Sequence, residues 1–218
     1  MIAIVDLGLG NLFSVDQAVH YSGGKSVITD DCEVIRKAER IILPGVGSYR
    51  FGMCAISNKG LYGCLKDSID SGTPVLGICL GMQLLMDSSE EHGYCRGLGI
   101  IPGRSIHFRN RVDFDSDCKV PHIGWNGLFK NVDGGQWHDS ILADVNEGDS
   151  CYFAHSYCVV PDKQEHILSL SRYGGCSYAS SVKHKNVTGC QFHPEKSGII
   201  GLKIIDNFIS GNSKGADK

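Results

Sequence analysis

Short strands that are apolar throughout alternate with helical patterns in the first half of the chain, and this alternation limits the possible folds most. Helical spacing is found in the intervals 12–22, 30–39 and 61–70, and a helical run follows residue 79. Because a strand without polar positions is covered on both faces, and an intervening helix places successive strands parallel, the pattern predicts an α/β fold. The expected architecture is a mostly parallel central sheet flanked by helices. The candidate strands are 2–6, 26–29, 40–43 and 74–78.

The second half of the chain has a different pattern, with short strand candidates separated by turn residues. We expect these strands to be antiparallel additions to the sheet or to stack beside it. A last helix is predicted at 198–209, from apolar residues at helical spacing. Residues 1–210 are expected to form a single domain, followed by a polar tail at 211–218. The six strand candidates are 100–108, 126–132, 151–160, 166–173, 176–184 and 187–192.

The charge and the hydropathy pattern exclude several classes of partner. A net charge of −3 over 218 residues gives no reason to expect binding to nucleic acid or to a membrane surface. No apolar run reaches the roughly 20 residues needed to span a bilayer, and the first residues lack the basic region of a signal peptide. We therefore expect a cytoplasmic protein.

Ten cysteines are scattered along the chain, with no CxxC pair among them. Zinc sites usually show two short ligand spacings, so no metal is expected. A disulfide framework is typical of exported proteins. Most of these cysteines are therefore predicted to be small apolar core residues in a reducing compartment. Cys79 is the exception because of its local sequence.

The segment GICLG places Cys79 between Gly77 and Gly81, where the fourth predicted strand gives way to a helical run. This is the cysteine form of the G-x-Nuc-x-G turn, in which a Cβ at either glycine would collide with neighbouring backbone. Such a turn presents the sulfur at the carboxyl edge of the sheet, near a helix N-terminus that favours the thiolate. The alternative is a structural cysteine in a tight turn, and spacing alone does not decide between them.

A cysteine nucleophile needs a base, and the base needs a group that orients it. In the segment CQFHPEKS, His193 stands at the end of a predicted strand and Glu195 follows across Pro194. If Glu195 accepts a hydrogen bond from one ring nitrogen, the other nitrogen can take the thiol proton, as in a triad with glutamate as third member. The alternative is a strand-end histidine beside a surface glutamate.

The PGVG segment after the third predicted strand could stabilise an oxyanion. Its glycines would let the backbone amides of Val46 and Gly47 face a ligand, and the N–H of Leu80 is a further candidate donor. The alternative is a simple loop between a strand and a helix. In a parallel sheet, however, this loop and GICLG lie at the same carboxyl edge, so the motifs support one another.

In their order and spacing, PGVGS, GICLGMQLL and QFHPEKS resemble the motifs of class I, or triad, glutamine amidotransferases. The resemblance extends from GLGNL at 8–12 to the last helix. PHIGWN at 121–126 and FAHSY at 153–157 are similar to segments in the glutaminase subunits of imidazole glycerol phosphate synthase, an enzyme of histidine biosynthesis.

This resemblance implies that Cys79 attacks the amide carbon of L-glutamine, that His193 handles the protons and that Glu195 orients His193. It implies no metal and no organic cofactor. It also implies a heterodimer in which ammonia enters a barrel-type cyclase subunit. The positions that match the family's glutamine pocket are Gly45, Gln83, Glu91, His155, Ser156 and Tyr157. The positions that match its partner surface, in an expected exposed turn, are Pro121, His122, Gly124, Trp125 and Asn126.

Other functions stay open at this point. The same triad could supply ammonia to a different synthase, such as one that amidinates surface sugars, makes pyridoxal phosphate or makes anthranilate, although PHIGWN argues against the last two. A protein of another class would sense redox state or bind a partner without catalysis, which the presence of Cys79, His193 and Glu195 argues against. A peptidase of related fold is disfavoured by Gln83 and HPEKS.

Overall fold

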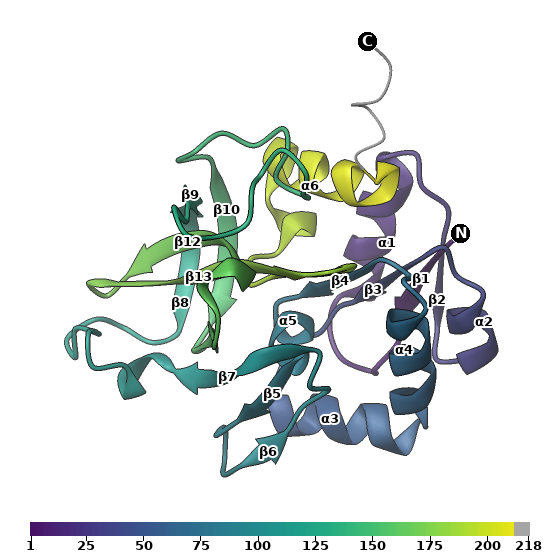
Figure 1. The fold of residues 1–218 in the computed structure, drawn as a ribbon, viewed down its shortest axis with the longest axis horizontal. Coiled ribbons are helices and arrows are strands. Elements are labelled where there is room, and N and C mark those ends of the chain that lie inside the picture. Colours follow the sequence, from purple (N-terminus) through teal and green to yellow (C-terminus); the bar gives the residue numbers. More distant parts are fainter. Residues whose placement is uncertain (212–218) are drawn as a thin grey trace.

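The computed structural model describes residues 1–211, and its central feature is one large mixed sheet (Figure 1). This sheet has 12 strands, and a separate sheet of two strands, β8 and β10, completes the fold. The α/β class is confirmed, and its parallel part contains the four strands predicted for the first half of the chain together with a strand at Val187–Cys190. Of the predicted polar tail, all but Gly211 lies outside the described residues.

Five parallel strands form one side of the large sheet, in the order β2-β1-β3-β4-β14. Four of them are buried almost without interruption, whereas the edge strand β2 is half-buried to exposed. Residues of the buried strands point alternately to two cores, as Ile4 and Leu76 do on one face and Ala3 and Leu43 on the other. The strands are β1 (Ile2–Val5), β2 (Ser26–Thr29), β3 (Arg40–Leu43), β4 (Val75–Ile78) and β14 (Val187–Cys190).

Helices cover both faces of the parallel strands (Figure 1). One face is covered by α1 (Leu12–Tyr21) and α6 (Gly198–Ser210). The other is covered by α2 (Cys32–Arg36), α3 (Tyr49–Asn58), α4 (Leu61–Asp70) and the short α5 (Leu80–Leu84). Within residues 1–211, none of the helices combines the length and the apolar character needed to cross a membrane.

Beyond β14 the sheet continues with strands that pair antiparallel, as predicted for the second half, except that β5 pairs with β7 in parallel. The path continues as β13-β11-β7-β5-β6, with β12 and β9 paired beside β13. The strands are β5 (Met86–Ser89), β6 (Cys95–Arg96), β7 (Ile101–His107), β8 (His122–Gly127), β9 (Phe129–Lys130), β10 (Ser150–His155), β11 (Tyr157–Pro161), β12 (Ile167–Tyr173) and β13 (Cys176–His184). Three short 3-10 helices are Phe108–Asn110, Gln164–His166 and Pro194–Lys196.

Several elements differ from the sequence-based expectation. The strand candidate at 187–192 was expected to be antiparallel, but β14 pairs with β4 in parallel, and β5 and β6 were not predicted. The helix α3 was not predicted, because one of its inward positions is Gly52, which adds no side chain to the apolar pattern between Tyr49 and Ile56. The segment PHIGWN was expected to be an exposed turn, but residues 122–127 form strand β8. The strand is fixed by antiparallel pairing with β10, in which Trp125 stands opposite Tyr152.

The cysteines follow the prediction only in part, since Cys54 is exposed and Cys95 and Cys118 are half-buried. Four of them, Cys151, Cys158, Cys176 and Cys190, are buried and free, as expected for small core residues. The expectation fails for Cys32 and Cys64, which the structure joins in a disulfide between α2 and α4. Sequence alone does not place these two helices against each other, so the pairing could not be predicted.

Candidate active site

Three neighbouring parallel strands, β3, β4 and β14, end at the same edge of the sheet. In their register, Leu43 of β3 lies beside Gly77 of β4, and Gly77 lies beside Gly189 of β14. The residues that follow these strands therefore meet in space, as expected at the carboxyl edge of an open α/β sheet. This topology brings the PGVG loop, Cys79 and His193 together.

The turn at Cys79 has the strained geometry that its flanking glycines predict. Cys79 has φ of 53°, a left-handed value that a non-glycine residue rarely adopts. A Cβ on Gly81 would lie 1.7 Å from the carbonyl oxygen of Leu43, and one on Gly77 would lie 2.8 Å from the backbone of Gly81. The glycines are therefore required by close packing of this turn against β3. Because α5 has only five residues, its dipole adds little to thiolate stability.

His193 and Glu195 form a buried pair next to the nucleophile. Their side chains are each 4% exposed, and Nδ1 of His193 lies 2.8 Å from Oε1 of Glu195. Burial disfavours the charged ring, but the hydrogen bonds with Cys79 and Glu195 outweigh it and raise the pKa of His193 to about 10. The ring therefore carries a proton at neutral pH that it can give to a leaving group.

The loop that carries His193 is held from two sides. The backbone N–H of His193 donates to the carbonyl of Tyr152 at 2.8 Å, and the Ser197 hydroxyl donates to the carbonyl of His193 at 2.6 Å. Ser197 also accepts the N–H of Tyr152. Ser197 has no signal in the sequence, because its role depends on contact between the 3-10 helix Pro194–Lys196 and β10 that only the fold reveals.

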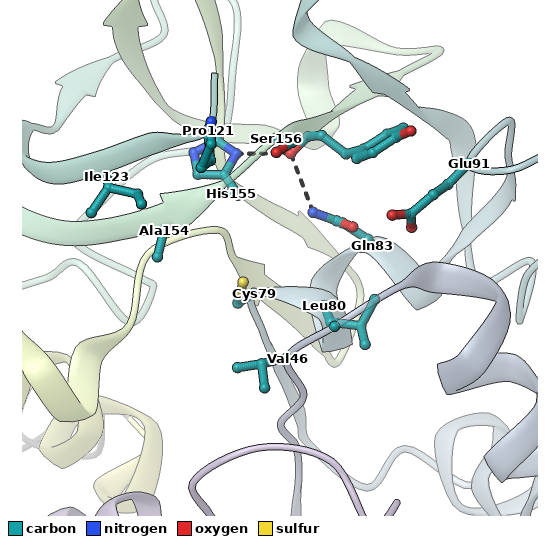
Figure 2. A pocket seen from close by; sticks show the side chains of 12 residues that line it. Val46, Cys79, Leu80, Gln83, Glu91, Pro121, Ile123, Ala154, His155 and Ser156 are labelled. Carbon is teal, nitrogen blue, oxygen red and sulfur yellow. Dashed lines mark hydrogen bonds between the residues drawn. The ribbon is translucent and has the colours of Figure 1, made fainter. Parts of the chain in front are cut away.

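A cavity of about 220 Å³ opens at Cys79 (Figure 2). This volume is below the range of roughly 300–1,000 Å³ typical of drug-sized ligands and suits an amino acid. Two lining residues, Ile123 and Ala154, were not predicted; they are cross-strand neighbours in the β8–β10 pair. The other lining residues all belong to the predicted site or partner surface: Val46, Gly47, Cys79, Leu80, Gln83, Glu91, Pro121, His155, Ser156 and Tyr157.

Gln83 and Glu91 place oxygen acceptors in this cavity (Figure 2). Because Nε2 of Gln83 donates to the carbonyl of Tyr157 at 3.2 Å, its oxygen Oε1 points the other way, toward the side where Glu91 lies. Glu91 follows β5 in a turn, and one of its oxygens accepts the N–H of Tyr49 at 2.6 Å. These acceptors suit the ammonium group of an amino acid.

The expected oxyanion donors are only partly in place. The N–H of Leu80 is already used, since it donates to the carbonyl of Gly45 at 3.3 Å. In this arrangement the Gly45–Val46 peptide directs its oxygen, and not its N–H, at the backbone beside the nucleophile. The prediction that Leu80 offers a free donor is therefore wrong for the conformation seen here. Gly45 itself does not line the cavity and acts through this carbonyl.

The family model for class-I glutamine amidotransferases matches residues 4–210. The chain belongs to this family. The amidotransferase is similar to curated proteins named imidazole glycerol phosphate synthase subunit HisH. It is 42% identical to that of Geobacillus kaustophilus over 211 residues, which cover 96% of both chains. It is 41% identical to that of Halalkalibacterium halodurans over 216 residues, covering 99% of this chain and 98% of the relative.

Solved structures show the same fold at low sequence identity. A crystal structure of a glutamine amidotransferase matches the amidotransferase with a TM-score of 0.70 and 14% identity, covering 97% of this chain and 98% of that one. PurLQS from Thermotoga maritima matches with a TM-score of 0.69 and 20% identity, covering 96% of each chain. These likenesses establish the fold alone.

The predicted partner residues of the amidotransferase divide into an exposed and a buried set. Trp125 is 59% exposed, and Pro121 and Ile123 are exposed beside it. His122, by contrast, is only 4% exposed because alternation along β8 turns it inward, so its predicted contact with a partner is wrong. Asn126 is partly buried, and its side chain donates to the carbonyl of Arg172 at 2.7 Å.

His122 and His155 form a neutral pair behind the cavity of the amidotransferase. Nδ1 of His155 donates to the carbonyl of Tyr157 at 2.8 Å, so its Nε2 accepts from Nδ1 of His122 at 3.3 Å. The ring of His122 also stacks between Phe153 and Tyr173. Burial lowers the pKa of His122 to about 4 and that of His155 to about 3.

This pair makes the stability of the amidotransferase dependent on pH. The folded pKa values lie below the unfolded value of about 6.5, so the contribution is complete above that pH and is lost as the pH falls toward 4 and 3. We expect the free energy of unfolding, measured with urea, to fall from pH 7 to pH 5. His122→Phe, which keeps the stacked ring, should show a smaller fall. An equal fall in the variant would contradict the assignment.

Proposed function

We propose that Cys79, His193 and Glu195 hydrolyse L-glutamine to glutamate and ammonia, and that the ammonia passes to a synthase partner. The chain is the glutaminase subunit of imidazole glycerol phosphate synthase, in histidine biosynthesis, as its similarity to HisH proteins over nearly the whole length indicates. The observation that carries the catalytic proposal is the meeting of the three side chains at the adjacent ends of β4 and β14. We assign residues 1–210 to one catalytic domain and expect it to act in the cytoplasm.

In the first half of the reaction, the thiolate of Cys79 attacks the side-chain amide carbon of glutamine. A sulfur–carbon bond forms, and the negative charge moves to the amide oxygen. The oxygen then regains its double bond, the carbon–nitrogen bond breaks, and His193 gives its proton to the nitrogen, which leaves as ammonia. The product on the enzyme is a thioester.

In the second half, His193 without its proton accepts one from water, which attacks the thioester carbon. The sulfur–carbon bond breaks, and glutamate leaves with Cys79 as thiolate and His193 protonated again. Glu195 holds Nδ1 of His193 at 2.8 Å, so that Nε2 serves both steps.

The substrate would be held by its amino-acid end. The oxygen of Gln83 and the carboxylate of Glu91 would accept from the substrate ammonium group. The segment from His155 to Tyr157 also lines the cavity. A glutamine bound in this way extends its side-chain amide toward Cys79, and a shorter amino acid would leave the amide carbon out of reach.

We propose that the resting geometry makes the enzyme slow until its partner is bound, because the N–H of Leu80 is occupied by the Gly45 carbonyl. Rotation of the Gly45–Val46 peptide would withdraw the Gly45 oxygen from Leu80 and turn the N–H of Val46 toward the site, freeing two oxyanion donors together. Loss of one such donor commonly costs roughly 100-fold to 1,000-fold in rate. We propose that partner binding favours the rotated peptide.

The partner that we propose is a barrel-type cyclase, docked on the exposed end of β8. Trp125, Ile123 and Pro121 present apolar surface there, and Pro121 and Ile123 also line the glutamine cavity. A partner seated on these residues would cover the mouth of the cavity and receive ammonia without releasing it to water. Trp125 is the aromatic anchor expected at the centre of such an interface.

Glutamate release, measured for the chain alone and with a candidate cyclase and its nucleotide ligand, tests this function. We expect a strong rise with both present. A rise with a surface-sugar synthase instead would keep the chemistry and change the pathway. No release from glutamine under any pairing would contradict the proposal.

Trp125→Ala should weaken binding of the cyclase by roughly 30-fold, the size expected for an aromatic hot spot. Glutamate release by the isolated chain should stay the same, because Trp125 does not line the cavity. Titration of the partner-stimulated rate gives the dissociation constant. The matched control is Tyr62→Ala, which removes an exposed aromatic side chain on α4 and should leave binding unchanged. Equal effects of both variants would contradict the docking surface.

A further inference from the structure

Gln191 is a fully buried polar residue that the reaction described so far does not use. It follows β14, one residue beyond Cys190, and its side chain is directed at the nucleophile. Its amide nitrogen Nε2 lies 3.6 Å from Sγ of Cys79, within hydrogen-bond range for sulfur. Gln191 does not line the glutamine cavity, so a role in holding substrate does not explain it.

The orientation of the Gln191 amide is fixed by its neighbours. The carbonyl of Tyr157 can only accept, so the atom of Gln83 that faces it at 3.2 Å is the donor Nε2. The same Nε2 lies 3.2 Å from the Gln191 amide, which must therefore present its oxygen Oε1 to it. Nε2 of Gln191 is left facing the sulfur.

We propose that Gln191 is a positioning residue, which donates a hydrogen bond to the thiolate of Cys79 and is itself set by Gln83 and the carbonyl of Tyr157. A hydrogen bond to the charged form of a group favours that form. Gln191 thus holds the sulfur in its strained turn and stabilises its negative charge. Gln83 also lines the cavity. The hydrogen bond between the Gln83 and Gln191 amides therefore connects the residue that contacts the substrate with the residue that contacts the thiolate.

The role predicts a ranked response to substitution. Gln191→Met keeps the volume but removes the donor, and Gln191→Glu keeps the shape but turns an oxygen toward the sulfur. We expect the rate of Cys79 alkylation by iodoacetamide, followed by mass spectrometry of the Cys79 peptide, to fall roughly tenfold at pH 7 in the methionine variant. The glutamate variant should react more slowly still. At high pH the methionine variant should approach the parent rate.

A positioning role also predicts which steady-state constant changes. If the proposed glutaminase function holds, kcat for glutamine should fall in both variants, and KM should change little. The inference rests on that function only for this readout, because alkylation of Cys79 is measured without glutamine. If the parent protein does not hydrolyse glutamine but the Gln191 variants show the expected slower alkylation of Cys79, the proposed function is contradicted and the Gln191 assignment stands.

Ser180→Ala is the matched control for a merely structural effect. The Ser180 hydroxyl bonds with Ser169, and its backbone accepts the N–H of Gln191, but its side chain makes no contact with Cys79. We expect its alkylation profile to match that of the parent. If thermal unfolding shows that the methionine variant does not fold, the alkylation profile of the nearly isosteric glutamate variant is used to test the proposal. An unchanged pH profile in a folded Gln191 variant would overturn the proposal.

Discussion

Cys79→Ser is expected to lower glutamine hydrolysis by roughly 10,000-fold, the scale seen when a triad nucleophile is removed. The serine hydroxyl fits the same turn but is a much weaker nucleophile than the cysteine sulfur. Cys79 is 6% exposed and the change removes no carbon atom, so thermal unfolding should stay close to that of the parent. Glutamate release with the cyclase present measures the effect.

Cys54→Ser is the control for the nucleophile. Cys54 is a free, exposed cysteine on α3, away from the ends of β3, β4 and β14, and its loss should leave the rate unchanged. Substantial glutamate release by a folded Cys79→Ser protein would show that another group attacks glutamine. A loss of activity in Cys54→Ser would contradict the assignment of Cys79 as the nucleophile.

Gly81→Ala should have the second large effect, because the new methyl group would lie 1.7 Å from the carbonyl oxygen of Leu43. The obstacle is backbone of a central strand, which cannot move aside as a flexible side chain does. We expect a loss of more than about 3 kcal/mol in unfolding free energy, together with loss of activity as the turn at Cys79 shifts. Urea unfolding and glutamate release measure the two effects.

Gly63→Ala makes the same chemical change where nothing stands in its way. No atom lies within 4 Å of the added carbon, and Gly63 is an exposed position inside α4. Alanine favours a helix over glycine by about 1 kcal/mol, so this variant should be as stable as the parent or slightly more so. If Gly81→Ala unfolds no more easily than Gly63→Ala, the close packing of the turn is not required.

The fold and the catalytic centre could be predicted because their signals are local in the sequence. Uniformly apolar strands separated by helices require a parallel sheet, and the end of each strand marks a position at the carboxyl edge. Cys79 follows such a strand, whereas the strand before His193 was expected to be antiparallel. That β14 lies parallel beside β4, and β4 beside β3, is shown only by the structure.

The rest of the site depends on contacts between distant segments. The sequence predicts an exposed turn at the position of β8, because the strand there depends on pairing with the distant strand β10. The same pairing buries His122 and leaves Trp125 exposed. The hydrogen bond from the N–H of Leu80 to the carbonyl of Gly45 depends on the orientation of the Gly45–Val46 peptide. The residue types do not predict that orientation.

The hydrogen-bonded environment of Gln191 could have been predicted from the sequence. It is a polar residue in the otherwise apolar segment leading to His193, and a buried glutamine must find partners for both ends of its amide. This requirement predicts a hydrogen-bonded site for Gln191, but only the structure identifies Gln83 and Cys79 as the partners.

The most direct test of the central claim is to trap the thioester. The chain, its cyclase and the nucleotide ligand would be mixed with radiolabelled glutamine and quenched in acid within the first turnover. We predict label on the peptide that contains Cys79, released by hydroxylamine as the γ-glutamyl hydroxamate, and none in Cys79→Ser. Glutamate formed without labelled protein, or label on any other residue, would contradict nucleophilic attack by Cys79.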